Sequence, residues 1–317
     1  MDHPTLSIVM PVYNAGSYIS QTVHSLLAQS FQDFELIIVD DSSTDNSVSI
    51  IHSFSDPRIR FFQNNENHGI VYTRNRGMSH MQGRFYAPFD ADDIAMPHKF
   101  EKQIQFLIEN ADYGMIGSWA QLINEANQLL NKKWKLNASP EAIPWILLFR
   151  NYFVHSAMVI RREAIPVGMY TAGFDLVEDY KMCFDISRKW KVWNTPEYLV
   201  KYRIHKHSHS RRDRDKMINA ERKVFDYVYQ EMGLQFGEEV FECIQQFRKG
   251  NKDISLTDYR KVERWLYGLW RDMITQYGYS RALKKVIYYQ WIKWVWSSRM
   301  TIIEAPWQLL RSPFIRE

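Results

Sequence analysis

Residues 6–43 read LSIVMPVYNAGSYISQTVHSLLAQSFQDFELIIVDDSS, and this stretch decides the fold class. Its two ends, residues 6–13 and 34–40, are almost continuously apolar and rich in β-branched side chains, which predicts strands buried on both faces. Between them, residues 17–31 carry apolar side chains at helical spacing. A strand, a helix and a second strand in this order predict a parallel pair joined by a crossover helix.

The same alternation continues to about Ser118. Further strands are predicted at 58–63, 84–90 and 113–119, and further helices at 44–54, 69–81 and 97–111. Pro97 suits the first turn of the last of these helices. We therefore expect an α/β domain with a Rossmann-like, mainly parallel sheet and helices on both faces.

The rhythm breaks after Ser118. A polar insertion, NEANQLLNKKWKLNASPEA, is followed by a segment that reads as a strand, a loop and a helix. From about Arg211 onward the sequence predicts only helices, with charged and aromatic residues. We expect a first domain at 1–210 and a C-terminal helical region at 211–317.

Composition narrows the functional classes. The chain of 317 residues is 45% hydrophobic, so disorder is not favoured, and its mild net charge of +4 gives no support for a nucleic-acid partner. No window is apolar enough to span a bilayer, and the N-terminus does not read as a secretion signal. Cys183 and Cys243 lack metal-ligand spacing and indicate a reducing compartment. The expected location is the cytoplasm.

Asp90, Asp92 and Asp93 follow the predicted strand at 84–90, at the sheet edge where ligands bind in parallel α/β folds. Carboxylates this close repel one another unless a cation or hydrogen-bond donors compensate. Hard divalent cations such as Mg²⁺ or Mn²⁺ prefer such oxygen ligands and complete their shell with water and phosphates. A solvated turn before the next helix is the alternative.

A second acidic stretch, VDDSSTDN, ends the strand at 34–40. Capping of the following helix by Ser43 or Thr44 would explain one polar residue there. The stretch offers several, so a binding role is also open.

The chain resembles the family 2 glycosyltransferases in an ordered set of segments: PVYN, VDDSSTDNS, NHGIVYTRNRG, FDADDIAMP, NYFVHSAMVIRREAI, GFDLVEDYKMC and YRIHKHSHS. The resemblance covers about the first two thirds of the chain. It implies the GT-A fold and inverting transfer from a nucleotide sugar.

The resemblance also implies roles for individual residues. Val12, Asn14 and Asp41 correspond to the pocket for the nucleotide base and ribose. Asp90 corresponds to the ribose-side acid, and Asp92 to the metal ligand that bridges to the diphosphate.

Two residue pairs extend this assignment. Arg74 and Asn75 match the family's RN pair near the nucleotide, although Arg74 can also be read as a cation on a helix surface. Glu178 and Asp179 match the ED pair, whose aspartate is expected to be the catalytic base. Acids that complement the dipole of a helix start are the alternative. Asp93 is expected to support the metal site indirectly or to start a helix.

His155 in NYFVHS is expected to line the site, with a satisfied core histidine as the alternative. The resemblance implies that His205 contacts the diphosphate or the metal, and that Arg203 and Arg211 supply positive charge. The three histidines of residues 202–212 lack a distant partner cluster for zinc, and a solvated loop remains open.

Residues 279–300 place Leu283, Ile287, Trp291 and Trp294 on one helical stripe flanked by lysines. Basic residues beside Trp and Tyr favour a membrane interface. A helix packed on the protein is the alternative. We expect peripheral contact with the cytoplasmic face of the inner membrane.

Together these features predict a metal-dependent hexosyltransferase that uses a UDP-hexose of the glucose or galactose type. The predicted acceptor is a saccharide hydroxyl, in a lipid-linked intermediate of bacterial O-antigen, lipopolysaccharide or capsule synthesis. Two alternatives use the same acidic turn: a metal-dependent phosphoesterase and a non-catalytic nucleotide-binding module.

Overall fold

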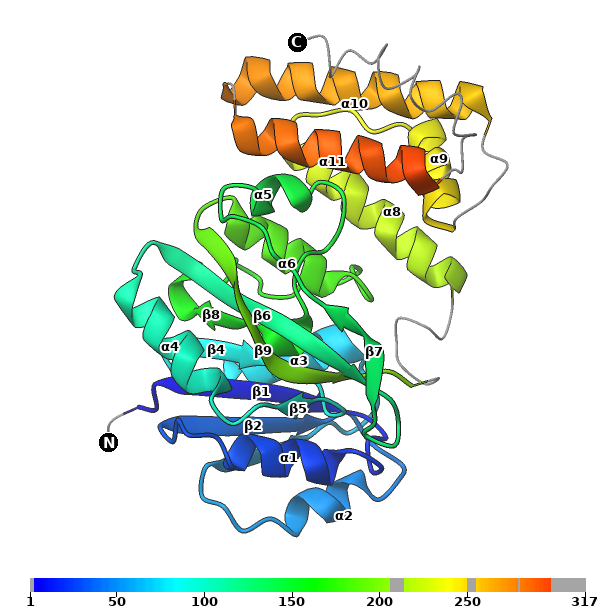
Figure 1. Ribbon diagram of the computed structural model, residues 1–317. Helices are drawn as coiled ribbons and strands as arrows, with labels where there is room; N and C mark the ends of the chain where they lie inside the picture. Colours follow the sequence, from blue (N-terminus) through cyan, green and yellow to red (C-terminus); the bar gives the residue numbers. More distant parts are fainter. Residues whose placement is uncertain (1–2, 206–213, 250–254, 279, 298–317) are drawn as a thin grey trace. The chain divides into compact units, whose positions relative to one another are not determined.

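A computed structural model describes residues 3–205, 214–249, 255–278 and 280–297 (Figure 1). For residues 247–249, 256, 259 and 291–297 the structure describes the backbone but not the side chains. The chain divides into two compact units, 1–224 and 225–317. The boundary predicted near residue 210 falls in 206–213, outside the described residues.

The first half of the sheet is parallel, as the sequence predicts. Its strands lie in the spatial order β3-β2-β1-β4, and each neighbouring pair is parallel. They are β1 (Leu6–Val12), β2 (Phe34–Asp40), β3 (Ile59–Gln63) and β4 (Phe85–Pro88). This half carries the polar strand ends that the sequence points to.

Beyond β4 the sheet is mixed. It continues through β8 (Val159–Arg161), β6 (Tyr113–Ile123), β9 (Lys191–Arg203) and β5 (Ile94–Ala95), with β7 (Leu129–Trp134) on β6. Only β6 and β9 are parallel here, and the other pairs are antiparallel. Strand β7 lies within the polar insertion and was not predicted. Its lysines suit an exposed edge strand, but they interrupt the apolar run by which a strand is recognised in a sequence.

Alternate side chains of β1 face opposite helix layers. Leu6, Ile8 and Met10 pack in one core cluster with α1 (Ile19–Leu27) and α4 (Lys99–Glu109). The opposite face receives α3 (Ile70–Ser79), where a Cβ added at Gly77 would lie 2.3 Å from Val9 Cγ1. Glycine therefore allows α3 to approach β1 closely, and helices cover both faces (Figure 1).

Two helix starts differ from expectation. Helix α4 begins at Lys99 rather than at Pro97, with His98 as its N-cap. Helix α2 (Ser47–His52) has Asn46 as N-cap without a side-chain capping bond, so the alternative that Ser43 or Thr44 caps this helix is wrong.

Short elements complete the first unit: α5 (Ile143–Ile146), the 3₁₀ turns η1 (His155–Ala157) and η2 (Arg162–Ala164), and α6 (Glu178–Ser187). The helical region consists of α8 (Arg214–Glu231), which crosses the division, followed by α9 (Glu238–Lys249), α10 (Leu256–Tyr277) and α11 (Arg281–Ser297).

Leu283 and Ile287 of α11 are fully buried, and α11 packs against α9 and α10. These two positions of the aromatic-apolar stripe therefore contact protein. The side chains of Trp291 and Trp294 lie outside the described residues. Among the described helices, none combines the length and the apolar character that crossing a bilayer requires.

Lys99 is a charged residue inside the core of the first unit. Its fully buried Nζ donates to Gln103 Oε1 at 2.9 Å and to Met158 O at 3.4 Å. Burial lowers the pKa of Lys99 well below its ordinary value. Between that lowered pKa and the unfolded value of about 10.4, the unfolded chain binds more protons, so stability rises with pH.

We expect Lys99→Met to raise the free energy of unfolding by about 1–3 kcal/mol at pH 7, because the apolar side chain removes this cost. Urea unfolding at pH 7 and pH 9 would measure the gain, which should shrink at the higher pH. Lys102→Met is the matched control: Lys102 is exposed and pairs with Glu197, so its change should stay within about 1 kcal/mol. An equal gain at both positions would contradict the explanation.

Candidate active site

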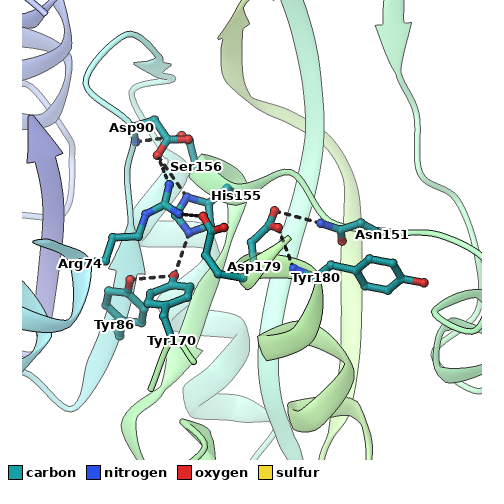
Figure 2. A network of polar contacts seen from close by, with 10 residues as sticks. Arg74, Tyr86, Asp90, Asn151, His155, Ser156, Tyr170, Asp179 and Tyr180 are labelled. Atoms are coloured by element: carbon teal, nitrogen blue, oxygen red, sulfur yellow. Dashed lines mark hydrogen bonds and ion pairs between the residues drawn. The ribbon is translucent and has the colours of Figure 1, made fainter. Parts of the chain in front are cut away.

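The predicted site residues converge from segments far apart in the sequence. Figure 2 shows Arg74 of α3, Asp90 beyond β4 and His155 of η1 in contact with one another, while Asp179 of α6 lies beside them with its carboxylate directed at Asn151 and Tyr180. The carboxyl ends of parallel strands meet at one edge of a sheet, and polar groups placed there face a common space.

The Arg74 guanidinium lies between two carboxylates. Its Nη2 donates to Asp90 Oδ1 at 2.8 Å, and its Nη1 forms an ion pair with Glu178 Oε1. The side chain is 8% exposed. The alternative reading of Arg74 as a surface cation is therefore wrong.

This pairing sets the charge states of the group. Burial alone would lower the pKa of Arg74, but Asp90 and Glu178 outweigh burial and raise it. Burial likewise opposes ionisation of Asp90, yet His155 and Arg74 hold the pKa of that carboxyl well below its usual range. Asp90 is therefore an anion at neutral pH.

His155 connects Asp90 to two buried tyrosines. Its Nδ1 lies 3.2 Å from Asp90 Oδ1, and its Nε2 lies 2.8 Å from the Tyr170 hydroxyl. The Tyr170 hydroxyl is 3.0 Å from that of Tyr86. Ser156 adds a contact to the same acid, since its Oγ accepts from Asp90 N at 3.1 Å. His155 is therefore a buried histidine with partners at both ring nitrogens, and its predicted contact with the donor stays a prediction.

Asp179 lies in the first turn of α6, next to Glu178. Its Oδ1 accepts from Tyr180 N at 2.7 Å, and its Oδ2 accepts from Asn151 Nδ2 at 2.9 Å (Figure 2). Burial and the neighbouring Glu178 raise the pKa of Asp179 to about 6, against the opposing effect of His155 and Arg74. A carboxylate with this pKa can accept a proton near neutral pH.

Asp92 and His205 lie together at the ends of β4 and β9. Asp92 Oδ2 is 2.8 Å from His205 Nε2, and the Asp92 side chain is 27% exposed. Among the described residues, no three His, Cys, Asp or Glu side chains are close enough to form a metal site by themselves. Two protein ligands nevertheless fit Mg²⁺ or Mn²⁺, which take up water and diphosphate oxygens as further ligands.

Arg203 holds the loop that carries Asp92. Its side chain is 1% exposed; Nε donates to Asp92 O at 2.7 Å, and Nη1 donates to Asn127 Oδ1 at 2.6 Å. These contacts are with the protein itself, and the predicted contact of Arg203 with the donor stays a prediction. Arg211 lies outside the described residues.

Asp93 does not start a helix, so that alternative is wrong, and its indirect support of the metal site stays a prediction. Strand β5 follows it directly, and its buried Oδ1 accepts from Arg203 N at 2.9 Å. Burial, together with the nearby Asp92 and Asp90, raises the pKa of Asp93 well above its ordinary value. Asp93 thus joins the loop at residues 90–93 to the end of β9.

The predicted nucleotide pocket lies at the ends of β1 and β2. Asn14 has a left-handed backbone (φ 50°), and its Oδ1 accepts from Thr44 N at 2.8 Å. Val12 O accepts from Asp41 N at 2.7 Å. The Asp41 carboxylate accepts from Gly69 N at 2.8 Å and so organises the loop before α3. Their contacts with a nucleotide stay predictions.

Asn75 has a role that the sequence did not reveal. Its amide bonds both backbone groups of Tyr170, donating to Tyr170 O at 2.8 Å and accepting from Tyr170 N at 3.0 Å. Tyr86, Asn151, Tyr170 and Ser156 were likewise missed. Asn151 and Ser156 belong to the NYFVHS segment, which resembles the family. The sequence therefore pointed to the segment but not to these two side chains.

Comparison with known proteins gives this site a context. The model overlays with S. aureus TarS 1-349 in complex with UDP-GlcNAc (TM-score 0.58, 14% identity, 97% of this chain and 92% of that chain). It also overlays with the mannosyltransferase PcManGT from Pyrobaculum calidifontis in complex with GDP-Man and Mn²⁺ (TM-score 0.56, 14% identity, 99% and 89%). The fold is GT-A. Residues 7–166 match the family model "Glycosyl transferase family 2", and the chain belongs to that family.

Two curated relatives refine the context. An uncharacterised glycosyltransferase of Haemophilus influenzae is 30% identical over 213 residues, which make up 64% of this chain and 66% of that protein. The UDP-Glc:alpha-D-GlcNAc-diphosphoundecaprenol beta-1,3-glucosyltransferase WfgD of Escherichia coli is 31% identical over 188 residues, 59% of this chain and 72% of that protein.

Proposed function

We propose that the protein transfers a hexose from a UDP-sugar to a saccharide hydroxyl with inversion at the anomeric carbon. The observation that carries the proposal is Asp179, a carboxylate whose pKa lies near neutrality beside the Arg74, Asp90 and His155 group. Family membership supports a glycosyltransferase. The activity in the name of WfgD, a UDP-Glc glucosyltransferase, supports UDP-glucose as the donor type.

In the proposed reaction Asp179 takes the proton of the acceptor hydroxyl. The acceptor oxygen forms a bond to the anomeric carbon from the face opposite the nucleotide, and the bond from that carbon to the diphosphate breaks with both electrons. Asp90, held as an anion by Arg74 and His155, is proposed to bind the ribose-side hydroxyls of the donor. Val12, Asn14 and Asp41 are proposed to hold the base and ribose.

Asp92 and His205 would hold Mn²⁺ or Mg²⁺ against the diphosphate. A bound divalent cation neutralises charge on a departing diphosphate, which lowers the barrier. The pair of a carboxylate and an imidazole 2.8 Å apart supports this assignment, as does the Mn²⁺ bound to PcManGT.

A donor panel tests the proposal. UDP-glucose, UDP-galactose, UDP-GlcNAc and GDP-mannose would each be incubated with Mn²⁺, with Mg²⁺ or with EDTA, and slow release of the nucleotide diphosphate scored. We expect one UDP-hexose to be hydrolysed fastest, and only with metal. Release of phosphate from simple esters would favour a phosphoesterase, and UDP binding without turnover would favour a non-catalytic module.

We further propose a lipid-linked acceptor at a membrane surface, supported by the diphosphoundecaprenol acceptor in the name of WfgD. Helix α11 exposes Lys285, and Tyr289, one turn further on, is 62% exposed. One lysine near an anionic surface contributes about 1 kcal/mol to binding. Lys285→Gln should therefore weaken binding to phosphatidylglycerol vesicles about fivefold in a sedimentation assay.

The exposed Lys191 of β9 provides the control, since it pairs with Asp112 and is not on α11. Lys191→Gln should leave vesicle binding unchanged. If Lys285→Gln binds vesicles as tightly as the unmodified protein, this contact of α11 with membrane is contradicted.

A further inference from the structure

Residues 151–156, which lead into and begin η1, contact two carboxylates of the candidate site: Asp179, the proposed base, and Asp90, the proposed ribose contact. Asn151 contacts Asp179, while His155 and Ser156 contact Asp90. Of these three contacts, the one from Asn151 is the only one directed at the proposed base.

The orientation of the Asn151 amide is set by two hydrogen bonds. Its Oδ1 accepts from Phe153 N at 3.0 Å, two residues further on. Its Nδ2 then faces Asp179 Oδ2 at 2.9 Å. The opposite orientation would place an amide oxygen against the carboxylate and an NH₂ group against the Phe153 N–H, so both contacts would become repulsive.

Asp179 is in an environment that disfavours its charge. Burial and the adjacent Glu178 both favour the protonated form and outweigh the opposing effect of His155 and Arg74. Arg74 is bonded to Asp90 and Glu178, so its guanidinium is directed at those two carboxylates. Within the described part of the chain, the direct hydrogen-bond donors to Asp179 are Asn151 Nδ2 and the Tyr180 backbone N–H, and donors to a carboxylate favour its charged form.

We propose that Asn151 is a positioning residue for Asp179: its amide fixes the direction of Oδ2 and helps keep the carboxylate in the ionised form that accepts a proton. The inference rests on the proposed function of Asp179 as the base. It adds a residue outside the ED pair, contributed by the segment that also holds Asp90.

The test is the titration of Asp179 in the donor-free protein. Carboxyl ¹³C NMR of protein labelled at aspartate would follow it, with the Asp179→Asn spectrum identifying the resonance. Asn151→Ala removes one hydrogen-bond donor to Asp179, and the titration midpoint of Asp179 should therefore move upward by about one pH unit. Asn151→Asp should move it further, because a second carboxylate then faces Oδ2.

Activity provides the second readout. The acid limb of the kcat profile should move upward in the same order, while the KM for the donor stays within about twofold. Asn194→Ala is the matched control, since this buried amide donates to Tyr152 O in the same segment at 3.3 Å. It should lower stability without moving the Asp179 midpoint. Asn151→Ser carries the same test if Asn151→Ala does not fold.

An unchanged Asp179 midpoint in folded Asn151→Ala and Asn151→Asp would overturn this inference. So would an equal shift in Asn194→Ala, because the effect would then come from loosening the segment. A midpoint that moves as expected in a protein without turnover of any nucleotide sugar would leave the role of Asn151 in place and contradict the proposed function instead.

Discussion

Asp179→Asn is expected to lower the rate of glycosyl transfer by about 10²–10⁴-fold, the range that a positioned general base contributes. The amide has nearly the same shape but cannot take up the acceptor proton. Nucleotide binding should survive, because the residues proposed for base and ribose, Val12, Asn14 and Asp41, lie at the ends of β1 and β2. Initial rates and UDP titration calorimetry on the same preparation would separate the two effects.

The same variant should lose the pH-dependent cost that the charge of Asp179 imposes on the folded protein, although its NH₂ group then faces one of the two donors to Asp179 at every pH. The pKa of Asp179 is raised to about 6 in the folded protein, above the unfolded value of about 3.9. The folded chain therefore binds more protons than the unfolded chain between these values, and stability falls as pH rises through them. Asp179→Asn should remove a cost of roughly 1–3 kcal/mol at pH 8 and almost none at pH 3.

For the unmodified enzyme this pKa predicts that kcat/KM falls below about pH 6, as Asp179 becomes protonated. Asp175→Asn, at an exposed position in the preceding loop, is the control and should change neither rate nor stability. Transfer at the normal rate by Asp179→Asn would refute the assignment of the base.

Arg74→Met is expected to destabilise the first unit by about 3–5 kcal/mol, the usual cost of removing one partner of a buried ion pair. The substitution leaves Asp90 and Glu178 without the cation between them. Without this cation the two carboxylates repel each other when both are ionised, so the loss of stability should grow from pH 5 to pH 8. Urea unfolding at the two pH values would measure it.

A double variant separates charge from packing. If the charge of Glu178 causes the damage, Arg74→Met with Glu178→Gln should recover part of the lost stability, and the coupling free energy should exceed about 1 kcal/mol. Arg76→Met, two residues along α3, is the control: Arg76 donates to Asn64 Oδ1 and Gln63 O, both uncharged, so its loss should cost about 1 kcal/mol. Equal losses at Arg74 and Arg76 would contradict the buried-pair explanation.

The sequence is sufficient to predict where a candidate site lies but not to describe its contacts. The ends of β1, β2 and β4 can be read from apolar runs that stop at polar residues, and this placed Asn14, Asp41 and Asp90 at one sheet edge. Strand β7 and the antiparallel pairing of β8 could not be read in the same way. Their apolar pattern is short or interrupted by lysines, and pairing direction leaves no periodicity in a chain.

Local features can be predicted from the sequence: which runs form strands and helices, and which acidic and basic side chains lie at their ends. Tertiary structure alone decided the partners. Arg74 meets Glu178 across 104 positions and Arg203 meets Asp93 across 110, while Asn151 meets Asp179 across 28. The reason is physical. Periodicity reports which face of an element is buried, whereas the partner and charge state of a side chain depend on the groups that packing brings against it.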